Sequence, residues 1–163
     1  RQNKIHHVIV GEGDTIETVS DVKIFILNPA KFENIPDSND NSIMLKLVYK
    51  NFSCLLCGDV IGKAIARIVT YGNFLKSDVM KVPHHGGGLE NSVAAKIFFE
   101  SISPKICIIS VGWQNRYGAP SQKTTDIITS LKSTSYDTKS CGAIKLFVDP
   151  MGYGINTHIE RKN

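Results

Sequence analysis

The chain has 163 residues, of which 42% are hydrophobic and 21% are charged, so it can fold as one globular domain with a buried core. This composition excludes an intrinsically disordered chain. The formal charge of +4, from 19 Lys and Arg against 15 Asp and Glu, permits a polyanionic substrate without requiring one. There is no apolar run of about 18 residues, and the first residues lack the apolar core of a signal peptide. We therefore expect a domain that makes no membrane contact itself and carries no export signal.

The first part of the chain contains short apolar runs bounded by turn-forming residues, a pattern typical of β-strands. The pattern predicts strands over residues 4–10, 22–29, 42–50 and 52–59. Lys50 and Asn51 separate the last two runs, which predicts a β-hairpin with a tight turn. Residues 30–42 are polar and include a proline, so we expect a surface loop there, with the least order in the chain.

After Asp59 the apolar residues recur every three or four positions, as on one face of a helix. This spacing, with its flanking stop signals, predicts helices over 60–74, 91–104 and 121–135. Strands are predicted between and after them, over 77–83 and 105–112 and as a closing pair within 142–161. Alternating strands and helices predict an α/β fold with a parallel sheet under covering helices, and nothing divides the chain into two domains.

Four cysteines occur in the sequence. Cys54 and Cys57 lie three positions apart on a predicted strand, where successive side chains alternate between the two faces. They cannot point the same way, so we expect no metal or redox pair. Cys54, Cys57 and Cys107 are expected to be buried free thiols, whereas Cys141, which precedes a glycine, is expected to be exposed.

Polar residues follow three successive predicted strands. Ligands bind beyond the carboxyl ends of parallel strands in an open α/β sheet, so we expect these side chains at one rim. Carboxylate and neutral imidazole suit zinc, manganese or iron, and the glycines after the histidine pair would allow a backbone or substrate to approach closely. The residues concerned are Asp59, His84, His85, Asn115, Arg116 and Tyr117.

Each of these residues also has an ordinary interpretation. Asp59 precedes a predicted helix and could be its N-cap, and the histidine pair could be polar residues of an exposed loop. Arg116 could be a surface charge, or its guanidinium could fork onto a phosphate. The shared position at three strand ends favours the functional interpretation.

Four motifs resemble the C-terminal metallo-β-lactamase-like domain of ComEC-type competence proteins, which take up DNA. They are "NDNSIMLKLVYKNFSCLLCGDV", "DVMKVPHHGG", "ISVGWQNRYGAPS" and "GAIKLFVD", in the family's order and spacing over residues 8–148. The resemblance implies an αββα sandwich that binds one or two divalent metals, zinc or manganese, and hydrolyses phosphodiesters such as those of DNA. It further implies a soluble domain of a bacterial membrane protein, whereas the expected free thiols fit a cytoplasmic location equally well.

The resemblance also implies residue roles. Asp59 would be a bridging metal ligand with a catalytic role, and His85 the late histidine ligand. His84 beside it would be a catalytic residue, either as a partner of the ligand His85 or as an alternative ligand. The substrate side would be lined by Asn115, Arg116 and Tyr117.

The sequence departs from the family pattern in ways that leave the function open. It contains no His-x-His-x-Asp-His stretch, so we expect an incomplete metal site and a chain that begins partway through the domain. Cys57, Gly87 and Ala119 replace a threonine, a serine and a histidine of the family motifs, and the histidines His6, His7 and His158 are expected to be ordinary strand residues.

Two functions follow from this pattern. The first is a metal-dependent nuclease-like hydrolase, and the second is a non-catalytic nucleic-acid-binding or scaffold module that retains the fold. Hydrolysis of a thioester, lactam or phosphocholine ester remains a third alternative, because a fold does not determine its substrate. For each of these functions we expect the uncovered apolar face of the sheet to bind a partner, which is either the absent N-terminal half of the domain or a second copy of the chain.

Overall fold

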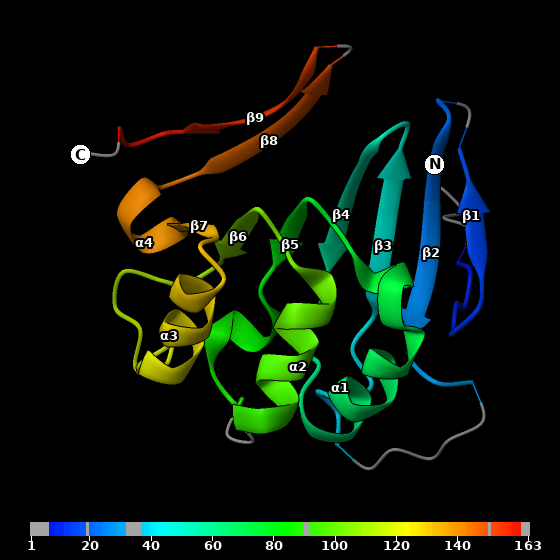
Figure 1. The fold of residues 1–163 in the computed structure, drawn as a ribbon, viewed down its shortest axis with the longest axis horizontal. Coiled ribbons are helices and arrows are strands. Elements are labelled where there is room, and N and C mark those ends of the chain that lie inside the picture. The colour runs from blue at the N-terminus through cyan, green and yellow to red at the C-terminus, as the bar shows by residue number, and fades with distance from the viewer. Residues whose placement is uncertain (1–6, 19, 32–36, 90–91, 150, 161–163) are drawn as a thin grey trace, which may run out of the picture.

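The computed structural model describes residues 7–18, 20–31, 37–89, 92–149 and 151–160 (Figure 1). Within them the chain forms a seven-stranded sheet, in which the strands lie in sequence order, and a separate two-stranded hairpin. The sheet strands are β1 (Thr15–Glu17), β2 (Val22–Asn28), β3 (Met44–Tyr49), β4 (Phe52–Leu56), β5 (Val79–Lys81), β6 (Ile106–Ile109) and β7 (Thr134–Asp137). Strands β1 to β4 pair antiparallel, and β4 to β7 pair parallel. The hairpin consists of β8 (Ile144–Asp149) and β9 (Gly152–Thr157).

Helices connect the parallel strands, as parallel pairing requires. They are α1 (Gly62–Ile68), the 3₁₀ helices η1 (Val69–Leu75) and η2 (Pro83–Gly86), α2 (Ser92–Ile102), α3 (Gln122–Ser130) and the short α4 (Thr138–Cys141). Figure 1 shows α1, α2 and α3 along one side of the sheet, whereas the β8–β9 hairpin lies apart from them.

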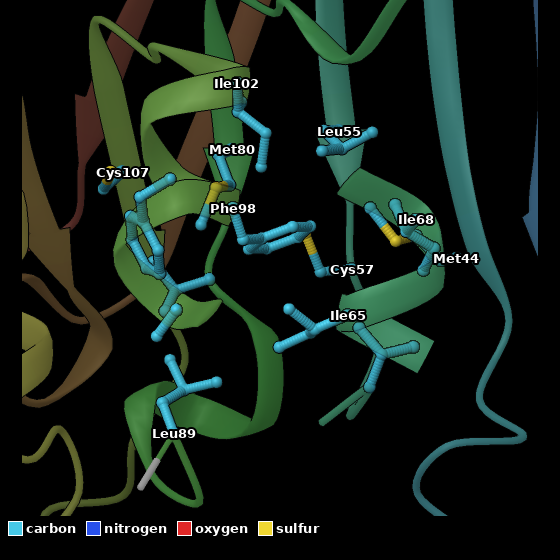
Figure 2. Close-up of a cluster of buried hydrophobic side chains, with 14 of the residues drawn as sticks. Met44, Leu55, Cys57, Ile65, Ile68, Met80, Leu89, Phe98, Ile102 and Cys107 are labelled. Atoms are coloured by element: carbon cyan, nitrogen blue, oxygen red, sulfur yellow. The ribbon is translucent and has the colours of Figure 1, made fainter. Parts of the chain in front are cut away.

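The main core lies between the helices and the sheet. Phe98 of α2 is fully buried in this cluster, and Figure 2 shows its ring between Met80 of β5 and Cys57 at the end of β4. Ile65 and Ile68 of α1 close the same cluster from the neighbouring helix. Burial of these side chains holds α1 and α2 against the sheet and thereby fixes the loops at the carboxyl ends of β4 and β5.

A second apolar cluster lies on the other face of the sheet. Strand register places Ile16, Ile24, Leu47, Cys54, Val79 and Ile106 in one row across six strands. The hairpin packs on one end of this face, where Leu146, Val148 and Tyr153 contact the cluster of Phe52, Cys54 and Val79. The face stays open at β1, where Ile16 is 41% exposed, and at the carboxyl end of β4, where Leu56 is 39% exposed.

The α/β fold class is confirmed, and so are most of the predicted elements. The Lys50–Asn51 hairpin turn, helix α2, and the parallel pairing of β4, β5 and β6 are found where they were predicted. The terminal strands form the predicted β8–β9 hairpin.

Several boundaries differ from the prediction. Residues 7–10 form no strand, and Val8 and Ile9 are 80% and 98% exposed, so nothing pairs with them; residues 4–6 lie outside the described part of the chain. The helix predicted over 60–74 ends at Ile68 and continues as a 3₁₀ helix that breaks at Gly72, whose φ is +53°. The helix predicted to reach residue 135 ends at Ser130, because the following residues pair with β6 as the unpredicted strand β7. Strand β1 and helix α4 were also missed.

The other single-residue expectations gave mixed results. Cys54, Cys57 and Cys107 are free and buried as predicted, whereas the prediction for Cys141 was wrong, because α4 packs its side chain inside with 2% exposure. Neither His7 nor His158 lies in a strand, and His6 falls outside the described residues. Among the helices described, none is long and apolar enough to span a bilayer.

Candidate metal-binding cleft

An open cleft of about 1000 Å³ lies beyond the carboxyl ends of β4, β5 and β6. The sequence-based expectation that three strand ends meet at one rim is therefore confirmed. Every predicted site residue lines this cleft, namely Asp59, His84, His85, Asn115, Arg116 and Tyr117. Which role each side chain has remains a prediction.

His85 and Asp59 face each other across the floor of the cleft. The Nδ1 atom of His85 lies 2.6 Å from the carbonyl oxygen of Ser110, which can only accept a hydrogen bond, so Nδ1 carries the proton in the neutral ring. The Nε2 atom then presents a lone pair, and it lies 3.7 Å from Oδ1 of Asp59. Both side chains are partly exposed, at 49% and 40%. A backbone carbonyl that orients a histidine in this way is the usual support of a metal ligand.

These two donors fit part of a divalent metal site. Neither His85 Nε2 nor Asp59 Oδ1 carries a proton in this tautomer, so these two atoms, 3.7 Å apart, form no hydrogen bond to each other but can bind the same ion. In the part of the chain that the structure describes, no third His, Cys, Asp or Glu joins them. A catalytic zinc usually has three protein ligands, so Asp59 and His85 account for two positions of such a site.

The two histidines occupy an uncommon backbone conformation. His84 has φ +45° and His85 has φ +56°, in the left-handed region that non-glycine residues rarely adopt. Two hydrogen bonds hold the turn, from the His84 amide to the Gly58 carbonyl (3.1 Å) and from the Gly87 amide to the His84 carbonyl (2.8 Å). The first of these ties the histidine turn to the turn that carries Asp59. Strain of this kind occurs preferentially at functional sites.

The ring of His84 packs against the backbone of Gly88. A Cβ atom at Gly88 would lie 2.6 Å from Nδ1 of His84, and the φ of +65° at this position further disfavours any side chain. Among the described residues this buried Nδ1 has no hydrogen-bond partner. The sequence led us to expect a backbone or substrate close to these glycines, whereas at Gly88 the group that approaches closely is the ring of His84.

The loop after β6 forms the opposite wall of the cleft. Asn115 shapes it, because its amide donates to the carbonyl of Ala119 and its Oδ1 accepts from the amide of Tyr117 at 3.0 Å. Arg116 and Tyr117 extend from this loop, and Tyr117 is 95% exposed.

Three supporting residues were missed from the sequence. Ser110 orients His85, and the hydroxyl of Thr138 exchanges two 2.8 Å hydrogen bonds with the backbone of Val111, where the cleft loop starts. Asp40, placed by the sequence in a poorly ordered loop, is 4% exposed. Only the "NDNS" motif marked its position, and the strand that leads to Thr138 was not predicted.

The fold is shared with a solved structure of another protein. A crystal structure of a protein from Parabacteroides distasonis named "Putative metal-dependent hydrolase" superposes with a TM-score of 0.51. The likeness covers 80% of this chain and 57% of that one, at 15% identity, which shows the fold alone. No family model matches the chain.

The sequence relatives are competence proteins. The chain is 30% identical over 122 residues to ComE operon protein 3 of Bacillus subtilis, and 32% identical over 97 residues to competence protein ComA of Neisseria gonorrhoeae. These matches cover 73% and 59% of this chain but only 15% and 14% of the relatives. The chain is thus homologous to a segment of ComEC-type competence proteins, and the resemblance drawn from the four motifs is confirmed.

Proposed function

We propose that this domain is a metal-dependent hydrolase of nucleic-acid phosphodiesters that acts in DNA uptake. The observation that carries the proposal is the pair of lone-pair donors, Asp59 Oδ1 and His85 Nε2, at 3.7 Å on the floor of a large cleft. The hydrolase fold and the competence relatives support it from two independent directions.

Each cleft residue has a part in this proposal. Asp59 and His85 would hold zinc or manganese, and such an ion supplies Lewis-acid activation of water and of a phosphoryl group. His84 lines the cleft with its Nδ1 buried, so its Nε2 is the ring atom that we assign to a hydrogen bond or proton transfer with the substrate. Arg116 would pair with a phosphate, and the exposed ring of Tyr117 would stack on a base.

The test compares metal content and nuclease activity in this chain and in a longer chain that contains it. We expect about two equivalents of zinc or manganese in the longer protein after chelator-free purification, and little in this segment. Asp59→Ala and His85→Ala should each lower metal content and DNA hydrolysis at least about 100-fold, since each removes a ligand. His158→Ala, which changes an exposed histidine outside the cleft, is the matched control. Full activity in both cleft variants would exclude the assignment.

A non-catalytic nucleic-acid-binding module is the second candidate. The observation that favours it is that no third metal ligand joins Asp59 and His85 among the described residues. Such a module would hold no transition metal even in the longer protein. It would bind DNA with an affinity that falls steeply with salt, and Arg116→Ala would reduce the salt slope by about one.

We also propose that the open part of the second sheet face is an interaction surface. Ile16 and Leu56 are exposed on this face. Ile16 lies at the β1 end of the apolar row that the hairpin covers at its other end, and Leu56 follows Cys54 of that row by two positions along β4. In the isolated chain the proposed occupant is a second copy, because an apolar sheet face favours burial against another. In the longer protein, further chain would take its place.

A further inference from the structure

The carboxylate of Asp40 is buried at the start of helix α1. Its Oδ1 accepts a hydrogen bond from the amide of Ile61, and its Oδ2 accepts one from the amide of Lys63, both at 3.0 Å. The N-cap residue Ile61 offers no side-chain hydrogen bond of its own. Asp40 therefore caps the helix from a distant loop, and its negative charge faces the positive end of the helix dipole.

The same loop also contacts the other side of the turn that carries Asp59. Gly58 packs so closely that a Cβ atom there would lie 2.8 Å from the carbonyl oxygen of Ile43 and 2.9 Å from Cβ of Ser42. Gly62 also packs against the loop, although less tightly, because its Cβ would lie 3.3 Å from Oδ2 of Asp40. The turn from 58 to 62 is thus held at both ends by residues 40–43, and Asp59 lies between the two anchors.

A buried amide fixes the loop in turn. The Nδ2 of Asn28, a residue with 0% exposure, donates to the carbonyls of Asp40 and Ser42, each at 2.7 Å. Its Oδ1 accepts from Arg67 of α1. Strand β2, the loop and helix α1 are therefore joined by one polar network, which makes the position of Asp40 rigid.

We propose that Asp40 is a positioning residue for the cleft, which fixes the turn of Asp59 and so sets its distance from His85. The Ser110 carbonyl orients the ring of His85. The network of Asn28, Asp40 and α1 therefore has to position the other donor, the carboxylate of Asp59. The inference rests on the proposed metal site, because a set distance between two donors matters only if they act on one ligand.

Manganese binding to this chain tests the inference. In NMR spectra, bound Mn²⁺ broadens the signals of nearby backbone amides, here those of residues 58–60 and 84–86. This site-specific broadening detects even weak binding. Asp40→Asn is nearly isosteric but removes the charge and one acceptor, so we expect the Mn²⁺ concentration at half-broadening to rise about tenfold. Ile102→Val is the control. It removes a methyl group from the same core and so lowers stability, but Ile102 is the last residue of α2 and does not line the cleft. It should leave Mn²⁺ binding unchanged.

A second variant tests the same contact in case Asp40→Asn fails to fold. Gly62→Ala would force a Cβ atom against Oδ2 of Asp40 and should weaken Mn²⁺ binding in the same direction. Asp59→Ala separates this inference from the proposed function. If Asp59→Ala abolishes the broadening but Asp40→Asn changes it no more than Ile102→Val does, the positioning role is wrong and the metal site stands. If the wild-type chain shows no site-specific broadening, Asp59 and His85 do not act on one ion in this chain and the positioning role is wrong, while the metal content of the longer protein decides the proposed function separately. If Asp59→Ala leaves the broadening unchanged, both are overturned.

Discussion

Burial of individual side chains determines the chemistry of the cysteines. Cys54 belongs to the cluster on the hairpin side of the sheet, and Cys57 belongs to the cluster on the helix side, as strand alternation predicts. Burial raises the pKa of the Cys54 thiol to about 11 and that of the Cys107 thiol to about 12, and it raises the pKa of Cys57 further in the same direction. The thiolate is the reactive form of cysteine, and a raised pKa makes it scarce. These three residues are therefore unreactive in the folded protein.

We therefore predict that the folded protein resists thiol reagents. At pH 8 the Cys54 thiolate should be about 100-fold scarcer than in the unfolded chain, and access adds a further barrier. A DTNB assay in native buffer should show slow labelling of Cys54, Cys57 and Cys107, whereas the same assay in urea should label all four cysteines at once. Rapid stoichiometric labelling of the native protein would contradict this burial.

At the scale of elements, the hairpin is the part of the fold with the fewest connections to the rest. It packs on the sheet through its inner face, where the ring of Tyr153 lies 4.9 Å from that of Phe52, centroid to centroid. It makes no contact with the core that holds α1, α2 and α3 within the described residues. Local opening of the hairpin should therefore require less free energy than opening of the helices.

Replacing Tyr153 by serine should loosen the hairpin alone. The loss of an aromatic contact should lower the free energy of local opening by about 1.4 kcal/mol, which is a tenfold increase in the opening equilibrium. Hydrogen exchange should accelerate in residues 144–157 and stay unchanged in α1 and α2. Asn156→Ser, on the exposed outer face of β9, is the matched control. Equal acceleration throughout the molecule would show that the hairpin belongs to the cooperative core.

At the scale of the whole molecule, the two faces of the sheet differ. The helices pack on one face, while the hairpin covers only the end of the other face near β4, β5 and β6. The isolated chain should therefore self-associate through the open part of this face.

The prediction is a monomer–dimer equilibrium in sedimentation or light scattering. Leu56→Glu should shift it towards monomer, because a charge on the face would be desolvated in the dimer. Val93→Glu changes an apolar residue of α2 that is 67% exposed but lies outside this face, so it should leave the equilibrium unchanged. A monomer at all concentrations, or equal effects of both substitutions, would exclude the face as the interface.

The sequence could predict what depends on neighbouring residues. Short apolar runs between turn residues located β2 to β6 and the terminal hairpin, and three-to-four spacing located α2, because burial of these elements is recorded in their own residues. It could not locate β1 and β7, since "TIE" and "TSYD" are short and mostly polar and become strands only by pairing with β2 and β6. Residues 7–10 show the converse, because an apolar run with no partner strand forms no strand.

The same division applies to the cleft. The sequence by itself determined six of the residues that line it, because parallel strands carry their last residues to a common edge, and it determined the competence-protein homology through four motifs. Only the tertiary structure decided that Ser110 orients His85, that Gly88 makes room for His84, and that Asp40 anchors the turn of Asp59. These contacts join residues more than 20 positions apart, or depend on a left-handed turn, so no local pattern of residue types records them.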